Sequence, residues 1–219
     1  SLAESELGAF ETWLAGEIRR LATSRDDEDE DEDEDEADAG DPLGLLAESL
    51  PSAVTKKLRK TKSVLAAFER DITELELGSR KIGELPAEIG EFTKLESLDL
   101  NDTGLVRLPA ELCKLAALTS LDLSWNQELA ALPDNIGQLQ HLKELSLASC
   151  WKLKTLPVQI GRLANLSWLD LTHCESFESL PIELGQARKL STVSLYGTQV
   201  TAENIAELQK LLPACKFNK

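Results

Sequence analysis

The 219-residue sequence is poor in rings and in sulfur-containing side chains other than cysteine. It has no methionine, two histidines and only 5% aromatic residues. A globule built round aromatic rings is therefore not expected, and the abundant leucine indicates a repetitive aliphatic core. The absence of even an initial methionine is compatible with loss of a start residue or of a longer targeting peptide, and the sequence leaves both open.

The cysteines are few and scattered. No two of them form a CxxC pair, and histidine is too rare to complete a zinc site, so neither a metal centre nor a dense disulfide framework is expected. A reducing compartment fits this usage best, and we expect no cofactor. The four positions are Cys113, Cys150, Cys174 and Cys215.

No apolar stretch is long enough to span a membrane. Residues 1–22 are interrupted by Glu4, Glu6, Glu11 and Glu17, which is unlike a signal peptide. We therefore expect an intracellular, cytoplasmic protein, with an organelle as the alternative if a targeting peptide has been removed.

The net charge of −16 is concentrated in one segment. Residues 26–41 hold thirteen acidic side chains and no basic one, which leaves −3 for the rest. Such dense like charge prevents compact packing and predicts a flexible acidic linker over 26–41. Because the remainder is not basic, nucleic acid is not expected as the main ligand.

The linker separates two segments with helical spacing. In residues 1–25, apolar side chains recur at intervals of three and four, which predicts an amphipathic helix that docks either on this chain or in a partner's groove. Residues 42–71 are expected to form a helical N-terminal cap. Its basic stretch KKLRKTK, at 56–62, is either a solvated helix face or a contact for the acidic tract or an anionic partner.

From residue 72 the sequence repeats, with successive spacings of 23, 23, 24, 24 and 24 residues. A fixed period of this size indicates a solenoid, in which neighbouring units stack to share one core. We expect about six units in residues 72–219. Their first apolar positions are Ile72, Leu95, Leu118, Leu142, Leu166 and Leu190.

The second unit, LESLDLNDTGLVRLPAELCKLAA, shows the expected course of one coil. Its alternating start predicts a short strand with Leu98 and Leu100 inward and Asp99 and Asn101 outward. Pro109 limits the return segment to an irregular or short helical start. Four later leucines are expected to turn the chain back along the opposite side: Leu105, Leu108, Leu112 and Leu115.

The pattern L-x-x-L-x-L-x-x-[N/C/T]-x-L-x-x-L-P-x-x-[I/L]-G-x-L resembles the leucine-rich repeat family. LPAEIGEF, LPDNIGQL and LPVQIGRL are similar to repeats of the intracellular plant type and the Ras-related group, and to those of some bacterial effectors. The resemblance implies an α/β leucine-rich-repeat solenoid that binds other proteins, with a short parallel sheet on its concave face.

The last unit is similar to final repeats that end in a helix and LP-x-CK. Thr201 is placed to cap this helix, and Pro213 to end it. We expect the helix to close the core at the C-terminal end. Its inward side chains are expected to be Ile205, Leu208, Leu211 and Leu212.

Cys150 and Cys174 lie three residues after the last strand leucine, where Asn126 stands in the third unit. In leucine-rich repeats this position faces inward and bonds the backbone of the turn. Reactivity would need a base and a charge that stabilises the thiolate. His173 does not supply them, since adjacent strand residues point to opposite faces. We therefore expect no catalytic residue and no enzyme.

The outward positions indicate a protein-binding face, acidic in its first half and aromatic in its second. The aspartates also have a structural explanation, because L-D-L is common in this repeat class. The expected ligand is a protein segment with basic and apolar residues. The candidate partner-binding residues are Asp99, Asp122, Trp125, Trp151, Trp168, Asp170, His173 and Tyr196.

These features predict a protein-interaction scaffold or adaptor, with the leading helix and acidic tether as a second contact. One alternative is an accessory subunit of a larger, even organellar, complex. A second is the substrate-recognition part of an effector-like ubiquitin ligase, and a third is an acidic chaperone for histones or other basic proteins. The oligomeric state has no signature in the sequence.

Overall fold

The computed structural model describes residues 73–79, 82–85 and 87–219. The chain divides into two units, Ser1–Lys62 and Ser63–Lys219, and every described residue belongs to the second. The helix predicted for 1–25, the acidic linker at 26–41 and the cap at 42–71 lie outside the described residues. These three features therefore stay predictions.

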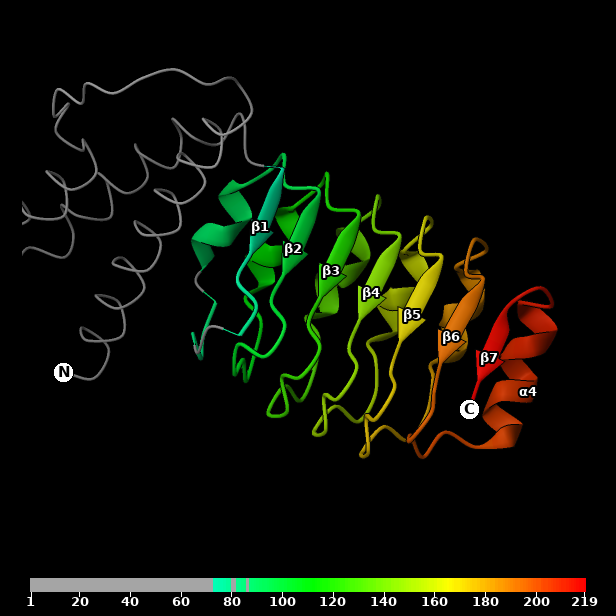
Figure 1. Cartoon of the computed structure of the whole chain (residues 1–219). Coiled ribbons are helices and arrows are strands. Elements are labelled where there is room, and N and C mark those ends of the chain that lie inside the picture. The colour runs from blue at the N-terminus through cyan, green and yellow to red at the C-terminus, as the bar shows by residue number, and fades with distance from the viewer. Residues whose placement is uncertain (1–72, 80–81, 86) are drawn as a thin grey trace, which may run out of the picture. The chain divides into compact units, whose positions relative to one another are not determined.

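The described residues form a succession of similar coils that runs from left to right, each with a three-residue strand on one side and, except in the last coil, a short helix on the other (Figure 1). Seven strands form one parallel sheet in chain order. The strands are β1 (Glu74–Glu76), β2 (Ser97–Asp99), β3 (Ser120–Asp122), β4 (Glu144–Ser146), β5 (Trp168–Asp170), β6 (Thr192–Ser194) and β7 (Lys216–Asn218).

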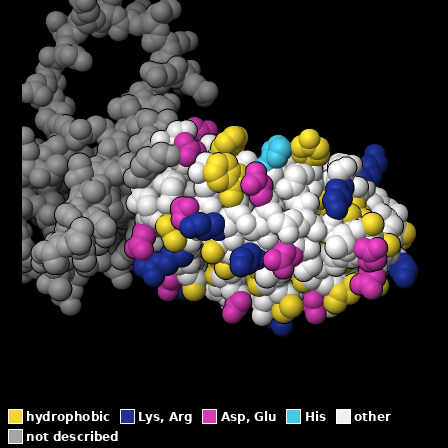
Figure 2. All heavy atoms as spheres, turned by 90° about the horizontal axis from the view of Figure 1, so that it is seen from below, with side chains coloured by type: hydrophobic (Ala, Val, Ile, Leu, Met, Phe, Trp, Pro, Cys, Tyr) yellow, Lys and Arg dark blue, Asp and Glu magenta, His cyan; other side chains and the backbone are white. Residues whose placement is uncertain are grey.

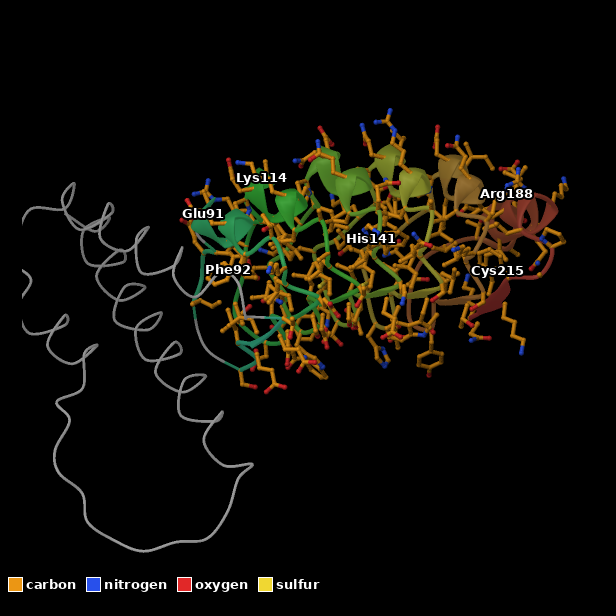
Figure 3. The ribbon with its side chains drawn as sticks, turned by 90° about the horizontal axis from the view of Figure 1, so that it is seen from above. Glu91, Phe92, Lys114, His141, Arg188 and Cys215 are labelled. Carbon is orange, nitrogen blue, oxygen red and sulfur yellow. The ribbon has the colours of Figure 1, made fainter. Side chains whose placement is uncertain are left out.

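Five 3-10 helices and one α-helix form the opposite side. They are η1 (Ala87–Glu91), η2 (Ala110–Lys114), η3 (Asp134–Gln138), η4 (Val158–Arg162), η5 (Ile182–Gln186) and α4 (Ala202–Leu211). Side chains such as Phe92 and Cys215 fill the interior between the two sides, whereas Lys114 and Arg188 lie on the helical side (Figure 3). The predicted solenoid is confirmed.

The strand register follows directly from the sequence period. Leu98 lies opposite Leu75 on one side and Leu121 on the other, so equivalent leucines stack along the sheet. Leu98 and Leu100 are buried, as predicted. Burial of an aliphatic side chain contributes roughly 1.5–3 kcal/mol, and each coil repeats this contribution. Stacked coils therefore share one continuous core.

The four leucines expected to turn the chain back along the opposite side are not equally buried. Leu108 is half-buried, whereas its equivalents Leu132 and Leu156 are buried. The position lies where the chain leaves the turn to enter the helical side, so its burial depends on the neighbouring coils. The spacing of the leucine predicts its position in the coil but not how completely other coils cover it.

Proline and glycine shape the helical side. Pro109, Pro133 and Pro157 immediately precede η2, η3 and η4 with extended backbones, so each helix begins where an N–H is not needed. A Cβ added at Gly137 or Gly161 would lie 2.6 Å or 2.1 Å from a backbone oxygen of the next coil. These glycines therefore let successive 3-10 helices pack backbone to backbone.

The C-terminal end of the solenoid contains the predicted helix and a strand that was not predicted. Thr201 Oγ1 accepts a hydrogen bond from Asn204 N at 3.2 Å, which caps α4. Of the four side chains predicted to face inward, Leu208 and Leu212 are buried and Ile205 is half-buried. The prediction for Leu211 is wrong, because this side chain is exposed at the edge of the helix. The chain then continues into β7, which pairs with β6. In β7 Phe217 takes the leucine position. The helix therefore forms the return side of the sixth coil, as predicted, and β7 begins a seventh.

Candidate functional site

The side chain four residues after β3, β4 or β5 forms a hydrogen bond to the backbone of the preceding coil. Cys150 Sγ donates to Leu123 O at 3.3 Å, and Cys174 Sγ donates to Leu147 O at 3.0 Å. Asn126 Nδ2 donates at 2.9 Å to the equivalent oxygen of its preceding coil. All three side chains are fully buried. The predicted inward, hydrogen-bonding role of both cysteines is therefore confirmed.

The thiols are unsuited to nucleophilic chemistry. Burial raises the pKa of Cys174 to about 12, of Cys113 to about 12 and of Cys215 to about 11, and it raises the pKa of Cys150 further. The thiols therefore stay protonated near neutral pH. Among the described residues, no group of three or more His, Cys, Asp or Glu side chains could hold a metal ion.

His173 is exposed while the adjacent Cys174 is buried, as expected, but the reason given by the sequence was wrong. β5 ends at Asp170, so neither residue lies in the strand. The two side chains separate because His173 takes a left-handed backbone conformation, with φ of 59°. The chain reverses there, and the ring points out of the coil.

Three of the candidate aspartates stabilise the turns that follow their strands. Asp99, Asp122 and Asp170 are the last residues of β2, β3 and β5, and each Oδ1 accepts the backbone N–H two residues later at 2.8 Å. Such a bond mimics a backbone turn. Ser146 and Ser194 stand at the same position in β4 and β6. These hydrogen bonds account for the L-D-L pattern.

In each of the first six coils, the residue three positions after the last strand residue has a left-handed backbone conformation. The N–H of each such non-glycine residue donates to a carbonyl of the next coil at 2.7–2.9 Å. The unusual conformation therefore aims one backbone donor at the neighbouring turn. We call these positions the left-handed column: Ser79, Asp102, Trp125, Ser149, His173 and Gly197.

The structure divides the candidate aromatic residues between two places. Trp168 begins β5 on the open sheet, between Glu144 of β4 and Thr192 of β6. Trp125 and Tyr196 were interpreted as outward strand positions, but they follow the ends of β3 and β6 because the strands are only three residues long. Trp151 lies in the turn after β4 and is exposed, as predicted near the rim.

His173 and Tyr196 form a preorganised pair in adjoining coils. Their ring centroids lie 5.3 Å apart at 83°, an edge-to-face arrangement. Gly197 makes this possible, because a Cβ there would lie 2.8 Å from His173 Nδ1. Gly197 was not among the residues predicted for the site. The sequence could have indicated it, because a glycine stands three residues after the strand, where the other coils hold serine, aspartate or larger residues.

We call the exposed rings at this edge the aromatic ledge, made of Trp125, His173 and Tyr196. Trp125 is 52% exposed and Tyr196 is 63% exposed. Figure 2 views the ends of the coils where the strands finish, and it shows hydrophobic side chains on both sides of a histidine along one edge. The ledge thus groups residues from the third, fifth and sixth coils.

The first six strands of the sheet beside the ledge carry charge of one sign. Within the described chain, the strands β1–β6 contain no lysine or arginine. Glu76, Asp99 and Asp122 lie directly opposite one another in β1, β2 and β3. Neighbouring strands are about 4.8 Å apart, so their charges reinforce one another. The acidic strand residues are Glu74, Glu76, Asp99, Asp122, Glu144 and Asp170.

Comparison with known families decides what kind of solenoid this is. Residues 74–152 match the profile of the leucine-rich repeat region, and the same coil continues to β7. The chain is a leucine-rich repeat protein. The plant-type or Ras-related character suggested by its LP-x-x-IG motifs stays a resemblance.

Solved leucine-rich repeat structures are similar over part of this chain. A leucine-rich repeat protein of Leptospira interrogans is 29% identical with a TM-score of 0.49, over 66% of this chain and 42% of that one. Internalin C2 of Listeria monocytogenes is 19% identical, with a TM-score of 0.49, over 67% and 62%. The Arabidopsis receptor kinase HAESA, solved with the peptide hormone IDA and the co-receptor SERK1, is 31% identical with a TM-score of 0.44, over 53% and 20%.

This leucine-rich repeat chain therefore spans less than two thirds of the length of each of these structures. A search of curated proteins found no match. Among the described residues, no helix is long and apolar enough to cross a membrane.

Proposed function

We propose that this protein is an interaction module that binds a protein partner through the sheet face and the aromatic ledge. Leucine-rich repeat folds commonly serve protein recognition. The observation that carries the proposal is the aromatic ledge, whose rings are exposed on a rigid scaffold that does not need them for its core. Aromatic side chains are the typical anchors of protein interfaces.

The chemistry of the face supports a partner with both basic and apolar residues. Acidic side chains of β1–β5 favour a cationic segment, and Trp125, Trp168 and Tyr196 favour apolar or planar groups. The cysteine thiols are buried, and no group of described His, Cys, Asp or Glu residues could hold a metal ion, so recognition accounts for the surface better than catalysis. The protein then acts as an adaptor or scaffold that holds its partner by this face.

The test replaces rings on the sheet side and compares them with matched changes elsewhere. Tagged protein carrying Trp125→Ala and Trp168→Ala should recover its specific partner from native extract at least about tenfold less efficiently than wild type. The control carries Val158→Ala and Ile182→Ala, which alter exposed apolar residues at the starts of η4 and η5.

Quantitative mass spectrometry gives the readout, with circular dichroism to show that both variants remain folded. A partner kept by the control and lost by the ring variant supports the proposal. Equal recovery by wild type and ring variant contradicts it, and equal loss in both variants also does, because the sheet face would then have no special role.

A further inference from the structure

The left-handed column contains bulky side chains, which rarely adopt a left-handed backbone conformation. Left-handed conformations are adopted freely by glycine, tolerated by aspartate and serine in turns, and disfavoured for bulky side chains. Gly197 shows the unstrained solution within this same chain. Trp125 instead combines φ of 61° with the largest side chain available. A tryptophan at this position therefore costs the fold some stability.

Burial does not explain the tryptophan. More than half of the Trp125 surface is exposed, at 52%. The N–H that the turn requires belongs to its backbone and donates to Ala148 O at 2.8 Å, which any residue except proline could supply. The indole is therefore the part of this residue that the scaffold does not use, and strain retained without a packing gain points to function.

The strands of the Trp125 coil and of the preceding coil both end in acidic residues. Asp122 ends the strand of the same coil, and Asp99 ends the strand of the preceding coil. Each carboxylate accepts hydrogen bonds through Oδ1, and among the described residues no donor bonds Oδ2 of either side chain. A tryptophan face beside carboxylates favours a cation with a planar, weakly hydrated head, which is the character of arginine.

On the other side, the ledge continues with the edge-to-face pair of His173 and Tyr196. Ser149, in the coil between Trp125 and His173, is buried. From the coil of Asp99 to that of Tyr196 there are four strand spacings, or about 19 Å, which about six residues of an extended chain can span. The surface thus matches a short extended segment that is basic at one end and apolar at the other.

We propose that the ledge and its acidic flank bind an extended protein segment bearing arginine, whose guanidinium lies on the Trp125 indole while an apolar residue meets His173 and Tyr196. This inference rests on the proposed function and adds the chemistry of the partner. An acidic or phosphorylated segment would face repulsion along β1–β3, where Glu76, Asp99 and Asp122 line up.

The test uses defined peptides and the full chain. An array of 12-residue peptides varies net charge, arginine content and apolar content independently, and the strongest arginine-containing binder is also made with citrulline, which keeps the shape but removes the charge. The acidic tract at 26–36 would also attract cations. A second protein with this tract replaced by glycine and serine therefore serves as a control.

Site-specific readout comes from the indole N–H signals in nitrogen-15 spectra, since the chain has only four tryptophans. The Trp125 signal, assigned by its loss in Trp125→Gly, should shift with the arginine peptide in both proteins. Citrulline and Trp125→Gly should each weaken binding about tenfold. Trp125→Gly should not lower the melting temperature, because glycine relieves the left-handed strain. The control Ile182→Ala should bind like wild type.

Several results would overturn the inference. These are equal binding of the citrulline and arginine peptides, a Trp125 signal that does not respond, preference for acidic peptides, or no binding by any peptide at millimolar concentration. If partner recovery from native extract still depends on the ring residues in those cases, the proposed function stands and only the arginine assignment fails. Loss of both contradicts the function itself.

Discussion

Among the side chains that the structure describes, Asn126 makes an extensive set of buried hydrogen bonds. Its Nδ2 donates to Leu100 O at 2.9 Å and to Leu123 O at 2.8 Å, and its Oδ1 accepts from Leu105 N at 2.8 Å. Thr103 Oγ1 also bonds Oδ1 at 3.0 Å. One buried amide therefore joins the turns of two coils.

Asn126→Ala should reduce the free energy of unfolding by about 3 kcal/mol, because several backbone groups would be buried without partners. Urea denaturation monitored by circular dichroism measures the change. Gln127→Ala is the matched control, since this neighbouring side chain is half-buried, and it should cost less than about 0.5 kcal/mol. Similar losses for the two variants would contradict the role assigned to Asn126.

The 3-10 helices depend on a small residue where successive coils touch. Gly90, Gly137, Gly161 and Gly185 occupy equivalent positions, and Cys113 takes the same position in η2. A Cβ at Gly161 would lie 2.1 Å from Glu183 O, which is backbone and cannot rotate away. The spacing between neighbouring helices is therefore limited by backbone contact at most of these positions.

Gly161→Ala should destabilise the solenoid by about 3 kcal/mol, since the neighbouring coil must shift. Thermal and urea unfolding measure this loss. Cys113→Ala provides the control at the equivalent position, where the structure already accommodates a side chain, and it should cost about 1 kcal/mol for the lost buried sulfur. A neutral Gly161→Ala would show that the coils can separate at little cost.

For the molecule as a whole, charge is divided between a local acidic run and an acidic sheet face. Residues 26–36 are all acidic, whereas β1–β6 carry acidic strand residues without lysine or arginine. Surface fields of this kind accelerate association with cations, and salt screens them. Both regions are therefore expected to contribute to the rate at which a basic partner arrives.

Replacing residues 26–36 with glycine and serine should slow association of the arginine peptide about tenfold at low salt and reduce its dependence on ionic strength. Stopped-flow fluorescence at several salt concentrations measures both effects. The dissociation rate should change little, because the contacts on the ledge are unaltered. An unchanged salt dependence would exclude the acidic run from partner capture.

The period of 23 or 24 residues already determines the solenoid, the core leucines and the inward cysteines, because in a stacked coil the spatial neighbour is always one period away. One further period of 24 residues leads from Thr192 to Lys216, its partner in β7. The strand β7 therefore follows the period, although its sequence KFN lacks the leucine pattern. The helix α4 follows from its cap and apolar spacing for equally local reasons.

The candidate site depended on contacts that no period encodes. Alternation placed Trp125 and His173 in strands, but three-residue strands end earlier, and the left-handed turns direct both side chains outward. The bond that Asp99 Oδ1 accepts from its turn is local, whereas the fit of His173 against Gly197 arises only when neighbouring coils pack against each other. Side-chain direction in a turn is set by the sign of φ and by the neighbouring coil, and both are properties of the folded chain.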